Sequence, residues 1–358
     1  MKSAQILTEL NAEVFQYWIP RLVADGVDPN DIEAVRTQVK LWEEWPKAWG
    51  ERGDAHRAWA EECLAAGHRI TAGEALVRAT LCYHFGQIIA FDDPNGKAAM
   101  QRRKTEAFRE ASPLLRPAAE CIEVPWRNLT LPGYLRLPET AKPAPCVVLV
   151  PGLDATKEDF HTFAEMCLRR GIGIFAFDGP GQGEMRARSP LGEGFETSIV
   201  AVIDYLALRP EIDPRRIAIL GRSLGGHYVL RAAAIDTRVA ATVVFGGIYD
   251  YSYWDSMPPL VREGFRQALG AATEKEAYAL IGGNTLDGCL KNVHCPVLVV
   301  HGKLDRIIPW KQAVRMVDEM PGRAALILDE DGVHCCHNHA IRYRPAMADW
   351  LATALRAA

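Results

Sequence analysis

Three residues that could carry out nucleophilic catalysis follow three separate apolar runs of the chain. The first is Ser223, within the segment Gly221–Gly225 (Gly-Arg-Ser-Leu-Gly), between the apolar run 216–220 and an apolar helical stretch. This Gly-x-Ser-x-Gly pattern, placed between a strand and a helix, is typical of a serine nucleophile in a strained turn that leaves no room for side chains two positions away. A structural glycine-rich turn is the alternative, and the strand–turn–helix context favours the nucleophile.

An acid and a histidine follow two later runs. Asp305 comes after the run 297–300, and His334 comes after the run 324–328. Taken singly, Asp305 would be a turn residue or helix cap and His334 a structural histidine. The order Ser, Asp, His along the chain is that of the α/β-hydrolase architecture, so the set predicts a triad in which His334 takes the Ser223 proton and Asp305 fixes the tautomer. His227 is an alternative base, but it would lack an acid partner within reach.

Two backbone N–H groups are the expected stabilisers of an oxyanion. The Leu224 N–H opens the helix after the serine, and the Leu153 N–H lies in the loop after the first parallel strand, where Gly152 lets the backbone approach. The loop Asp178–Gly183 (Asp-Gly-Pro-Gly-Gln-Gly) has glycine spacing that differs from a phosphate-binding loop. We therefore expect a rigid loop at the rim of the sheet.

Eight apolar runs predict the scaffold that positions these residues. Most are nearly continuous, as in strands covered by helices on both faces, which predicts an α/β fold with a mostly parallel, eight-stranded, doubly wound sheet. The first two runs read as an antiparallel pair. The runs are 121–125, 129–138, 146–150, 172–177, 216–220, 240–245, 297–300 and 324–328.

The first third of the chain lacks strand-like alternation and predicts an all-helical domain over residues 1–118, leaving 119–358 as the catalytic domain. Helical spacing begins with the apolar residues from Ile6 to Trp18, and a capping box at Thr71–Glu74 introduces a helix from Ala75 to Ile89. A second helix is expected from Ala98 to Leu115. Residues 250–290 exceed the length of one crossover helix and predict a lid insertion. Five tryptophans of the helical part favour core packing over a ligand pocket: Trp18, Trp42, Trp45, Trp49 and Trp59.

Composition and charge limit the kinds of molecule that this protein is expected to bind. The 358 residues carry a net charge of −4, which gives no basic field for nucleic acid, and no apolar run approaches eighteen residues. We expect a cytoplasmic protein with a small-molecule substrate and no membrane partner. Nine cysteines, an odd number without regular spacing, indicate free thiols. The run His334–His339 (His-Cys-Cys-His-Asn-His) is rich in metal-ligand types, but adjacent cysteines do not suit one tetrahedral centre, so neither metal nor cofactor is expected.

The loop after residue 151, the loop Asp178–Gly183, the serine turn and the segment Asp331–Asn338, behind a helical N-terminal third, resemble one family of enzymes. This is the α/β-hydrolase family typified by 2,6-dihydroxypseudooxynicotine hydrolase, to which fungal polyketide-shortening pigment hydrolases and fermentation-respiration-switch-like proteins are related. The resemblance implies the triad Ser223, Asp305 and His334, a helical cap over the active site, a homodimer, and cleavage of a carbon–carbon bond next to a ketone.

The family also implies an auxiliary acid after the strand that ends at Phe245. Asp250, Asp255 and the neighbouring tyrosines are the alternatives here, and no single one aligns. Aromatic side chains that would suit a flat aromatic substrate are Tyr249, Tyr251, Tyr253, Trp254 and Tyr83, with ordinary packing as the alternative for each.

Two further functions remain open at this point. A carboxylesterase or acyl transferase would use the same triad, because only the leaving group differs. A regulatory binding protein on a hydrolase scaffold is the third hypothesis, and an intact Ser, Asp and His set argues against it.

Overall fold

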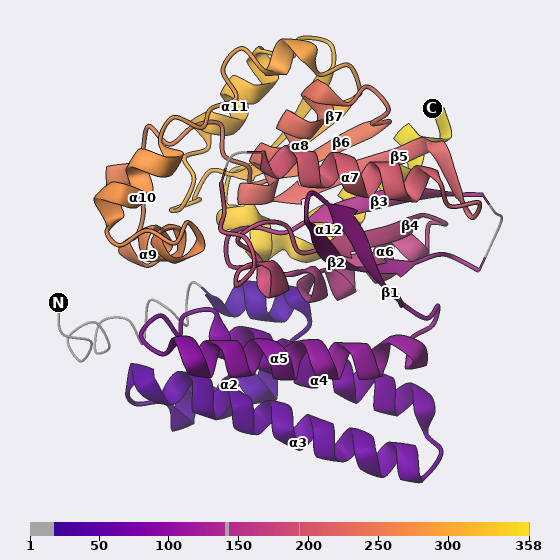
Figure 1. The fold of residues 1–358 in the computed structure, drawn as a ribbon, viewed down its shortest axis with the longest axis vertical. Helices are drawn as coiled ribbons and strands as arrows, with labels where there is room; N and C mark the ends of the chain where they lie inside the picture. The colour runs from indigo at the N-terminus through magenta and orange to yellow at the C-terminus, as the bar shows by residue number, and fades with distance from the viewer. Residues whose placement is uncertain (1–17, 140–142, 193, 358) are drawn as a thin grey trace. The chain divides into compact units, whose positions relative to one another are not determined.

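The computed structural model describes residues 18–139, 143–192 and 194–357, and the chain divides into two compact units, Met1–Glu120 and Cys121–Ala358 (Figure 1). The predicted apolar pattern from Ile6 to Phe15 lies outside the described residues. Across those residues, no helix combines the length and apolar character needed to cross a membrane.

The described part of the first unit is helical. Residues 18–25 form a helical stretch, and longer helices and short 3₁₀ turns follow. These elements are α2 (Pro29–Gln38), η1 (Trp42–Glu44), α3 (Trp45–Ala65), α4 (Arg69–Gln87), α5 (Pro94–Ala111) and η2 (Ser112–Leu114).

Both predicted helix starts in this unit were wrong. Helix α4 begins at Arg69, and Thr71 lies inside it, because Gly67, with φ +80°, turns the chain and the helix resumes at once. Helix α5 begins at Pro94 rather than Ala98. The Asp93 side chain accepts a hydrogen bond from the Gly96 N–H at 2.8 Å, and proline suits the first helical position since its missing N–H would have no partner there.

Tryptophan packing holds part of this unit together. Trp45 and Trp49 are fully buried, with ring centroids 5.7 Å apart in an edge-on arrangement, and the Trp45 indole donates to the Phe85 carbonyl at 2.8 Å. Trp59, in contrast, is 42% exposed. Core packing, the favoured interpretation, therefore describes Trp45 and Trp49 but not Trp59.

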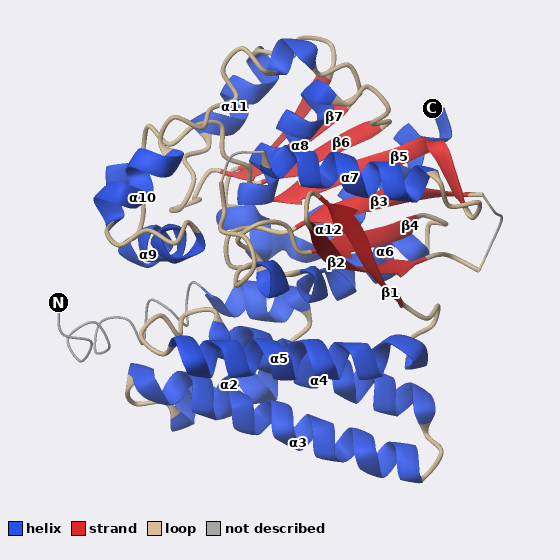
Figure 2. Ribbon diagram, viewed as in Figure 1, coloured by secondary structure: helices blue, strands red, loops and turns tan. Residues whose placement is uncertain are grey.

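The second unit is built on the predicted eight-stranded sheet, with spatial order β1-β2-β4-β3-β5-β6-β7-β8. Strand β2 runs antiparallel to β4, and β4, β3, β5, β6, β7 and β8 are parallel (Figure 2). The mostly parallel α/β-hydrolase sheet is thus confirmed. Its strands are β1 (Glu120–Trp126), β2 (Leu129–Arg136), β3 (Ala144–Val150), β4 (Gly173–Phe177), β5 (Ile212–Arg222), β6 (Ala241–Phe245), β7 (Val297–Gly302) and β8 (Ala324–Asp329).

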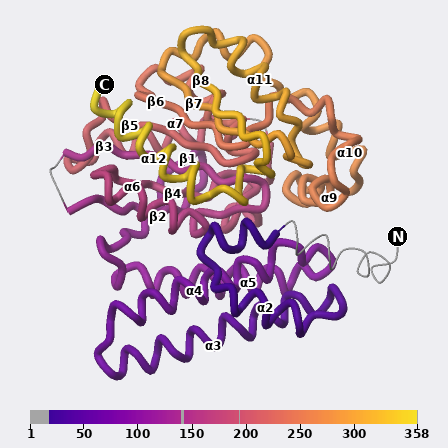
Figure 3. The backbone as a smooth tube through the Cα atoms, turned by 180° about the vertical axis from the view of Figure 1, so that it is seen from behind, coloured from indigo at the N-terminus to yellow at the C-terminus, as the bar shows by residue number. Residues whose placement is uncertain are grey.

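Two hydrophobic cores cover the two faces of this sheet. Cys146, Val148 and Val150 of β3 join the core under α7, α8 and α11, whereas Val147 and Leu149 join the core under α6 and α12. This alternation follows from the two-residue period of a strand, and Figure 3 shows α6 and α12 from behind. The helices are α6 (His161–Leu168), α7 (Phe195–Ala207), α8 (Leu224–Ile235), α11 (Lys311–Asp318) and α12 (Ala340–Ala357).

The chain between β6 and β7 is helical where a lid insertion was predicted. It contains η5 (Trp254–Ser256), α9 (Pro259–Ala268), α10 (Glu274–Ile281) and η6 (Leu290–Asn292). Shorter 3₁₀ turns elsewhere in the unit are η3 (Lys157–Phe160), η4 (Gly183–Met185) and η7 (His334–His339). Action of the 250–290 segment as a lid stays a prediction.

Candidate active site

Ser223, His334 and Asp305 come together at the carboxyl ends of three strands. The Ser223 Oγ lies 3.0 Å from the His334 Nε2, and the His334 Nδ1 lies 2.7 Å from the Asp305 Oδ2. The serine follows β5, the aspartate follows β7 and the histidine opens η7 after β8. In this geometry the hydroxyl can donate to Nε2 while Nδ1–H donates to the carboxylate, which is the arrangement that turns a serine into a nucleophile.

A sharp turn exposes the serine at the top of β5. Ser223 has φ +55° and ψ −120°, a conformation that side-chain-bearing residues rarely adopt. A Cβ at Gly221 would overlap the Gly225 carbonyl, and one at Gly225 would overlap the Val150 carbonyl. The glycines of the motif are therefore required by the close approach of the backbone, as the sequence predicted.

Backbone strain at Ser223 leads to a stability prediction. Ser223→Gly should be more stable than Ser223→Ala by about 1 kcal/mol, because glycine relieves a positive φ while alanine keeps the Cβ and loses the same hydroxyl. Urea unfolding of the two variants measures the difference. Equal stability, or a more stable alanine variant, would show that the turn stores no strain.

The environment of Asp305 keeps it ionised. Its Oδ1 accepts the N–H groups of Ile307 and Ile308 at 2.8 and 2.9 Å. Burial alone would raise the pKa of this carboxyl, but the imidazoles of His334 and His301 outweigh burial and hold the pKa well below its usual range. His301 Nε2 lies 3.3 Å from Asp305 Oδ2 and 3.0 Å from the Ile308 carbonyl oxygen. Sequence reasoning gave His301 no role, although its position four residues before Asp305 at a strand end is a signal.

His334 is held as a strong base. Burial opposes its charged form, yet the Asp305 carboxylate outweighs this and raises the pKa of His334 well above its ordinary value. The Cys335 thiol lies 3.6 Å from His334 Nε2 and donates to the Phe245 carbonyl at 3.3 Å. That same carbonyl accepts the Ser223 N–H at 2.8 Å. Cys335 is thus a neighbour of the site that the sequence identified only as a free thiol.

The two N–H groups predicted to stabilise an oxyanion are both available to donate a hydrogen bond. Within the described part of the chain, neither the Leu153 N–H nor the Leu224 N–H donates a hydrogen bond to the protein. Leu224 is the first residue of α8, where an N–H has no intrahelical acceptor. Gly152 lies against the serine, since a Cβ there would be 3.2 Å from the Ser223 Cβ and 3.7 Å from its Oγ.

The predicted auxiliary residues differ in their surroundings. Tyr249 donates to Glu319 Oε1 at 2.7 Å, and Asp250 accepts from Ser252, Gln312 and Arg315. These two side chains form structural hydrogen bonds, and among the described residues no hydrogen bond joins either of them to Ser223. Trp254 packs on Phe265 and Tyr278, with ring centroids 5.6 and 5.5 Å away. Tyr83 belongs to the helical unit, where its hydroxyl donates to Asp54 at 2.8 Å.

The surroundings of Tyr253 differ from those of the other predicted auxiliary residues. In the described structure its hydroxyl is buried without a hydrogen-bond partner. Burial first, and then the nearby charges of Asp305 and Asp250, raise the pKa of Tyr253 well above its ordinary value. The hydroxyl is therefore a protonated donor within electrostatic range of the triad carboxylate.

The competing histidines serve other contacts. His227 Nδ1 lies 3.2 Å from the Ile248 carbonyl oxygen, and burial lowers the pKa of His227 to about 4. His339 Nδ1 pairs with Asp329 Oδ2 at 2.5 Å, and His337 Nδ1 lies 3.4 Å from Arg344. Both lie in η7, directly before α12, and among the residues that the structure describes His334 is the only histidine hydrogen-bonded to Ser223.

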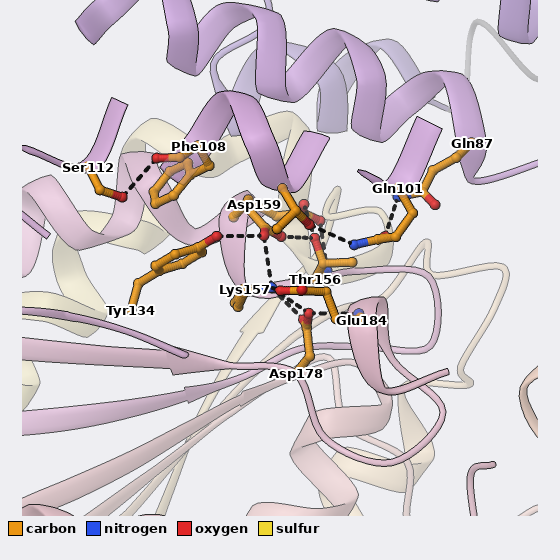
Figure 4. Close-up of polar contacts among 12 residues, drawn as sticks. Gln87, Gln101, Phe108, Ser112, Tyr134, Thr156, Lys157, Asp159, Asp178 and Glu184 are labelled. Carbon is orange, nitrogen blue, oxygen red and sulfur yellow. Dashed lines mark hydrogen bonds and ion pairs between the residues drawn. The ribbon is translucent and has the colours of Figure 1, made fainter. Parts of the chain in front are cut away.

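Two clusters of described side chains have ligand types that could hold a metal ion, and neither includes the His334–His339 run. One is Asp31, His56 and Cys82. The other is Glu158, Asp178 and Glu184, and the Lys157 ammonium lies among these carboxylates at 2.9, 2.7 and 2.8 Å (Figure 4). A buried lysine already supplies the positive charge there, so this cluster is an ion-pair network.

The sheet, the strained serine turn and the Ser–His–Asp arrangement at its carboxyl edge are those of an α/β hydrolase. The sequence model described as "Esterase FrsA-like" matches residues 22–256, and that of the prolyl oligopeptidase family matches residues 160–357. The chain therefore belongs to the FrsA-like family of α/β hydrolases, and the resemblance inferred from its motifs is confirmed.

Among its relatives is the 2,6-dihydropseudooxynicotine hydrolase of Paenarthrobacter nicotinovorans, 36% identical over 92% of this chain and 90% of that protein. A solved structure of 2,6-dihydroxy-pseudo-oxynicotine hydrolase matches with a TM-score of 0.88 over 94% of this chain and 96% of the other. The 20-hydroxy-prefusarin hydrolase of Gibberella moniliformis is 33% identical over 58% of this chain, which spans 53% of that fungal protein.

Proposed function

We propose that this enzyme is a serine hydrolase that cleaves a carbon–carbon bond next to a ketone in an aryl ketone or polyketide-like substrate. The observation that carries the proposal is the unbroken hydrogen-bond chain from Ser223 Oγ through His334 to Asp305. The choice of a carbon–carbon bond rests on the relative of 36% identity that covers nearly the whole chain. No cofactor is needed for this reaction.

The proposed reaction proceeds in two halves. His334 Nε2 takes the hydroxyl proton as Ser223 Oγ adds to the ketone carbon, and the Leu153 and Leu224 N–H groups stabilise the oxyanion. Collapse of the adduct breaks the carbon–carbon bond, and the electron pair leaves on a carbon whose charge a second carbonyl or an electron-rich ring delocalises. That carbon gains a proton from a nearby donor, to which His334 passes the proton it took from Ser223. Neutral His334 then activates a water molecule, which hydrolyses the acyl-serine to a carboxylic acid.

The departing carbon needs a proton donor that an ester's aryloxide leaving group does not need. We assign this role to the Tyr253 hydroxyl, which is buried, protonated and without a partner in the described structure.

Tyr253→Phe tests this role. The variant should lower kcat for an aryl 1,3-diketone about 100-fold, as expected for loss of a general acid, and leave hydrolysis of a p-nitrophenyl ester unchanged. Steady-state kinetics with both substrates measures the contrast. Tyr251→Phe is the matched control, since the Tyr251 hydroxyl is also buried without a partner in the described residues but lacks the influence of Asp305. Equal losses on both substrates would contradict the assignment.

A carboxylesterase or acyl transferase with the same triad is the second candidate, favoured by the description of the matching family as esterase-like. A fluorophosphonate probe and two substrates distinguish the candidates. Wild-type enzyme should be labelled and Ser223→Ala should not; absence of this difference would refute the serine mechanism. Turnover of aryl esters without turnover of aryl 1,3-diketones would refute carbon–carbon cleavage and establish the esterase.

We further infer from the family resemblance that residues 1–118 act as the cap domain that selects the substrate, and that the enzyme is a cytoplasmic homodimer. Light scattering of the purified protein measures the oligomeric state, and a monomeric mass would refute the dimer.

A further inference from the structure

A buried glutamine forms hydrogen bonds with the loop that carries one predicted oxyanion donor. The Gln182 side chain is 1% exposed and uses its amide fully: Nε2 donates to the Pro151 carbonyl at 2.6 Å and to the Gly152 carbonyl at 2.9 Å. Its Oε1 accepts the Gly179 N–H at 3.0 Å. Gln182 belongs to the loop Asp178–Gly183, which the sequence identified only as a rigid loop at the rim.

The Gly152 carbonyl and the Leu153 N–H belong to one peptide plane. In a trans peptide the two groups point in opposite directions, so a hydrogen bond that fixes the carbonyl also fixes the direction of the N–H. Gln182 therefore determines where the Leu153 N–H points, although it lies on the other side of that peptide. Gly152 contacts the nucleophile, as a Cβ at this position would lie 3.7 Å from Ser223 Oγ.

Further hydrogen bonds hold the loop after β3 against the segment 178–186. Arg186 Nη2 donates to the Leu153 carbonyl at 3.0 Å, and its Nε donates to the Gly181 carbonyl at 3.0 Å. At the far end, the Lys157 N–H donates to Asp178 Oδ1 at 2.9 Å. The peptides on both sides of Leu153 thus have their carbonyls held by side chains, while the Leu153 N–H donates to no protein group in the described structure.

We propose that Gln182, assisted by Arg186, is a positioning residue for the oxyanion hole: it holds the Gly152–Leu153 peptide with the Leu153 N–H aimed at the oxygen that becomes negative. This rests on the proposed serine mechanism. The residue touches neither substrate nor Ser223, so it acts on the rate only through the Leu153 donor. A preorganised donor contributes because it does not have to reorient as charge develops.

The test is Gln182→Met, which keeps the volume of the side chain and removes both donors. We expect kcat for a p-nitrophenyl ester and the rate of fluorophosphonate labelling to fall together, about 10- to 100-fold, with KM changed less than about threefold, because loss of a whole oxyanion donor costs about 10²–10³. A boronic acid that forms a tetrahedral adduct with Ser223 should weaken in parallel. The acid limb of the pH profile, set by His334, should not move.

Arg186→Lys provides a second test if the methionine variant does not fold. We expect the same pattern at a smaller loss, about 3- to 10-fold in kcat, since lysine cannot reach both carbonyls with the same geometry. Arg323→Lys is the matched control: Arg323 also donates to a backbone carbonyl, that of Val293 at 2.6 Å, but precedes β8 at the opposite edge of the sheet. Its kinetics should equal those of the wild type.

The outcomes separate the two proposals. An unlabelled wild-type enzyme overturns the serine mechanism and this inference with it. A labelled wild type with unchanged labelling of Gln182→Met and Arg186→Lys overturns the positioning role alone. A loss that appears in KM and in ground-state binding as much as in kcat would also overturn it, because that pattern belongs to general distortion of the site.

Discussion

Asp305→Asn is expected to lower kcat about 10⁴-fold while leaving the fold intact. The asparagine amide would face His334 Nδ1, where the carboxylate now accepts at 2.7 Å. An N–H in that place favours the tautomer with its proton on Nε2, which cannot accept from Ser223. Steady-state kinetics on a p-nitrophenyl ester measures the loss, and circular dichroism verifies the fold.

The pH profile should change in a defined direction. Neutral His334 is the base, so kcat/KM of the wild type should rise with pH through a pKa well above the ordinary histidine value, because Asp305 outweighs burial. Removal of the carboxylate removes the largest influence that raises the pKa of His334, so the acid limb of Asp305→Asn should move to lower pH.

Asp329→Asn is the matched control for this substitution. Asp329 forms a similar pair with His339 at the end of β8, but in the described structure this pair has no hydrogen bond to Ser223 or His334. Its kcat should equal that of the wild type, because Asp329 has no part in the hydrogen bonds that join Ser223, His334 and Asp305. An Asp305→Asn variant that retains a tenth of the activity, or keeps the acid limb in place, would contradict the assigned role of Asp305.

The meeting of Ser223, Asp305 and His334 was predictable because each follows an apolar run, and runs of this kind become strands of one parallel sheet. Strand β7 lies between β6 and β8, and the reactive groups gather at the shared carboxyl edge by topology alone. The close backbone approach at Gly221 and Gly225 was also predictable, because it requires glycine and therefore leaves the Gly-x-Ser-x-Gly pattern in the sequence. The starts of helices were less predictable. A proline such as Pro94 can stand just after the end of one helix or at the first position of the next.

The hydrogen bonds and ion pairs that hold the loops of the site in place were not predictable, because they join segments that are distant in the chain. Gln182 reaches the loop at Pro151, and Lys157 meets Asp178 from a different strand end. A single sequence gives spacing within a segment but does not pair segments. His301 shows the intermediate case, where the spacing to Asp305 was visible but the shared carboxylate oxygen required the structure.

Lys157→Met should have the largest effect on stability, lowering the free energy of unfolding by about 3–5 kcal/mol, because it removes the cation from a buried network. The Lys157 side chain is 1% exposed, and its ammonium lies among the carboxylates of Glu158, Asp178 and Glu184. Figure 4 shows the contacts with Asp178 and Glu184. Burial alone would lower the pKa of Lys157, but Asp178 and Glu158 outweigh it and raise this pKa well above its ordinary value. The lysine is therefore charged throughout the range in which the protein would be studied.

Urea unfolding at several pH values tests this prediction and its sign. In the wild type, the contribution of a lysine with a raised pKa is fully present below its unfolded pKa, so it should stay constant between about pH 5 and 8. In Lys157→Met the carboxylates lose their cation and take up protons more readily, so the deficit should shrink as pH falls. Lys303→Met is the control, because Lys303 pairs at the surface with Glu330, itself 73% exposed, and should cost less than about 1 kcal/mol. A Lys157→Met loss no larger than that of the control would show that the buried carboxylates do not depend on this cation.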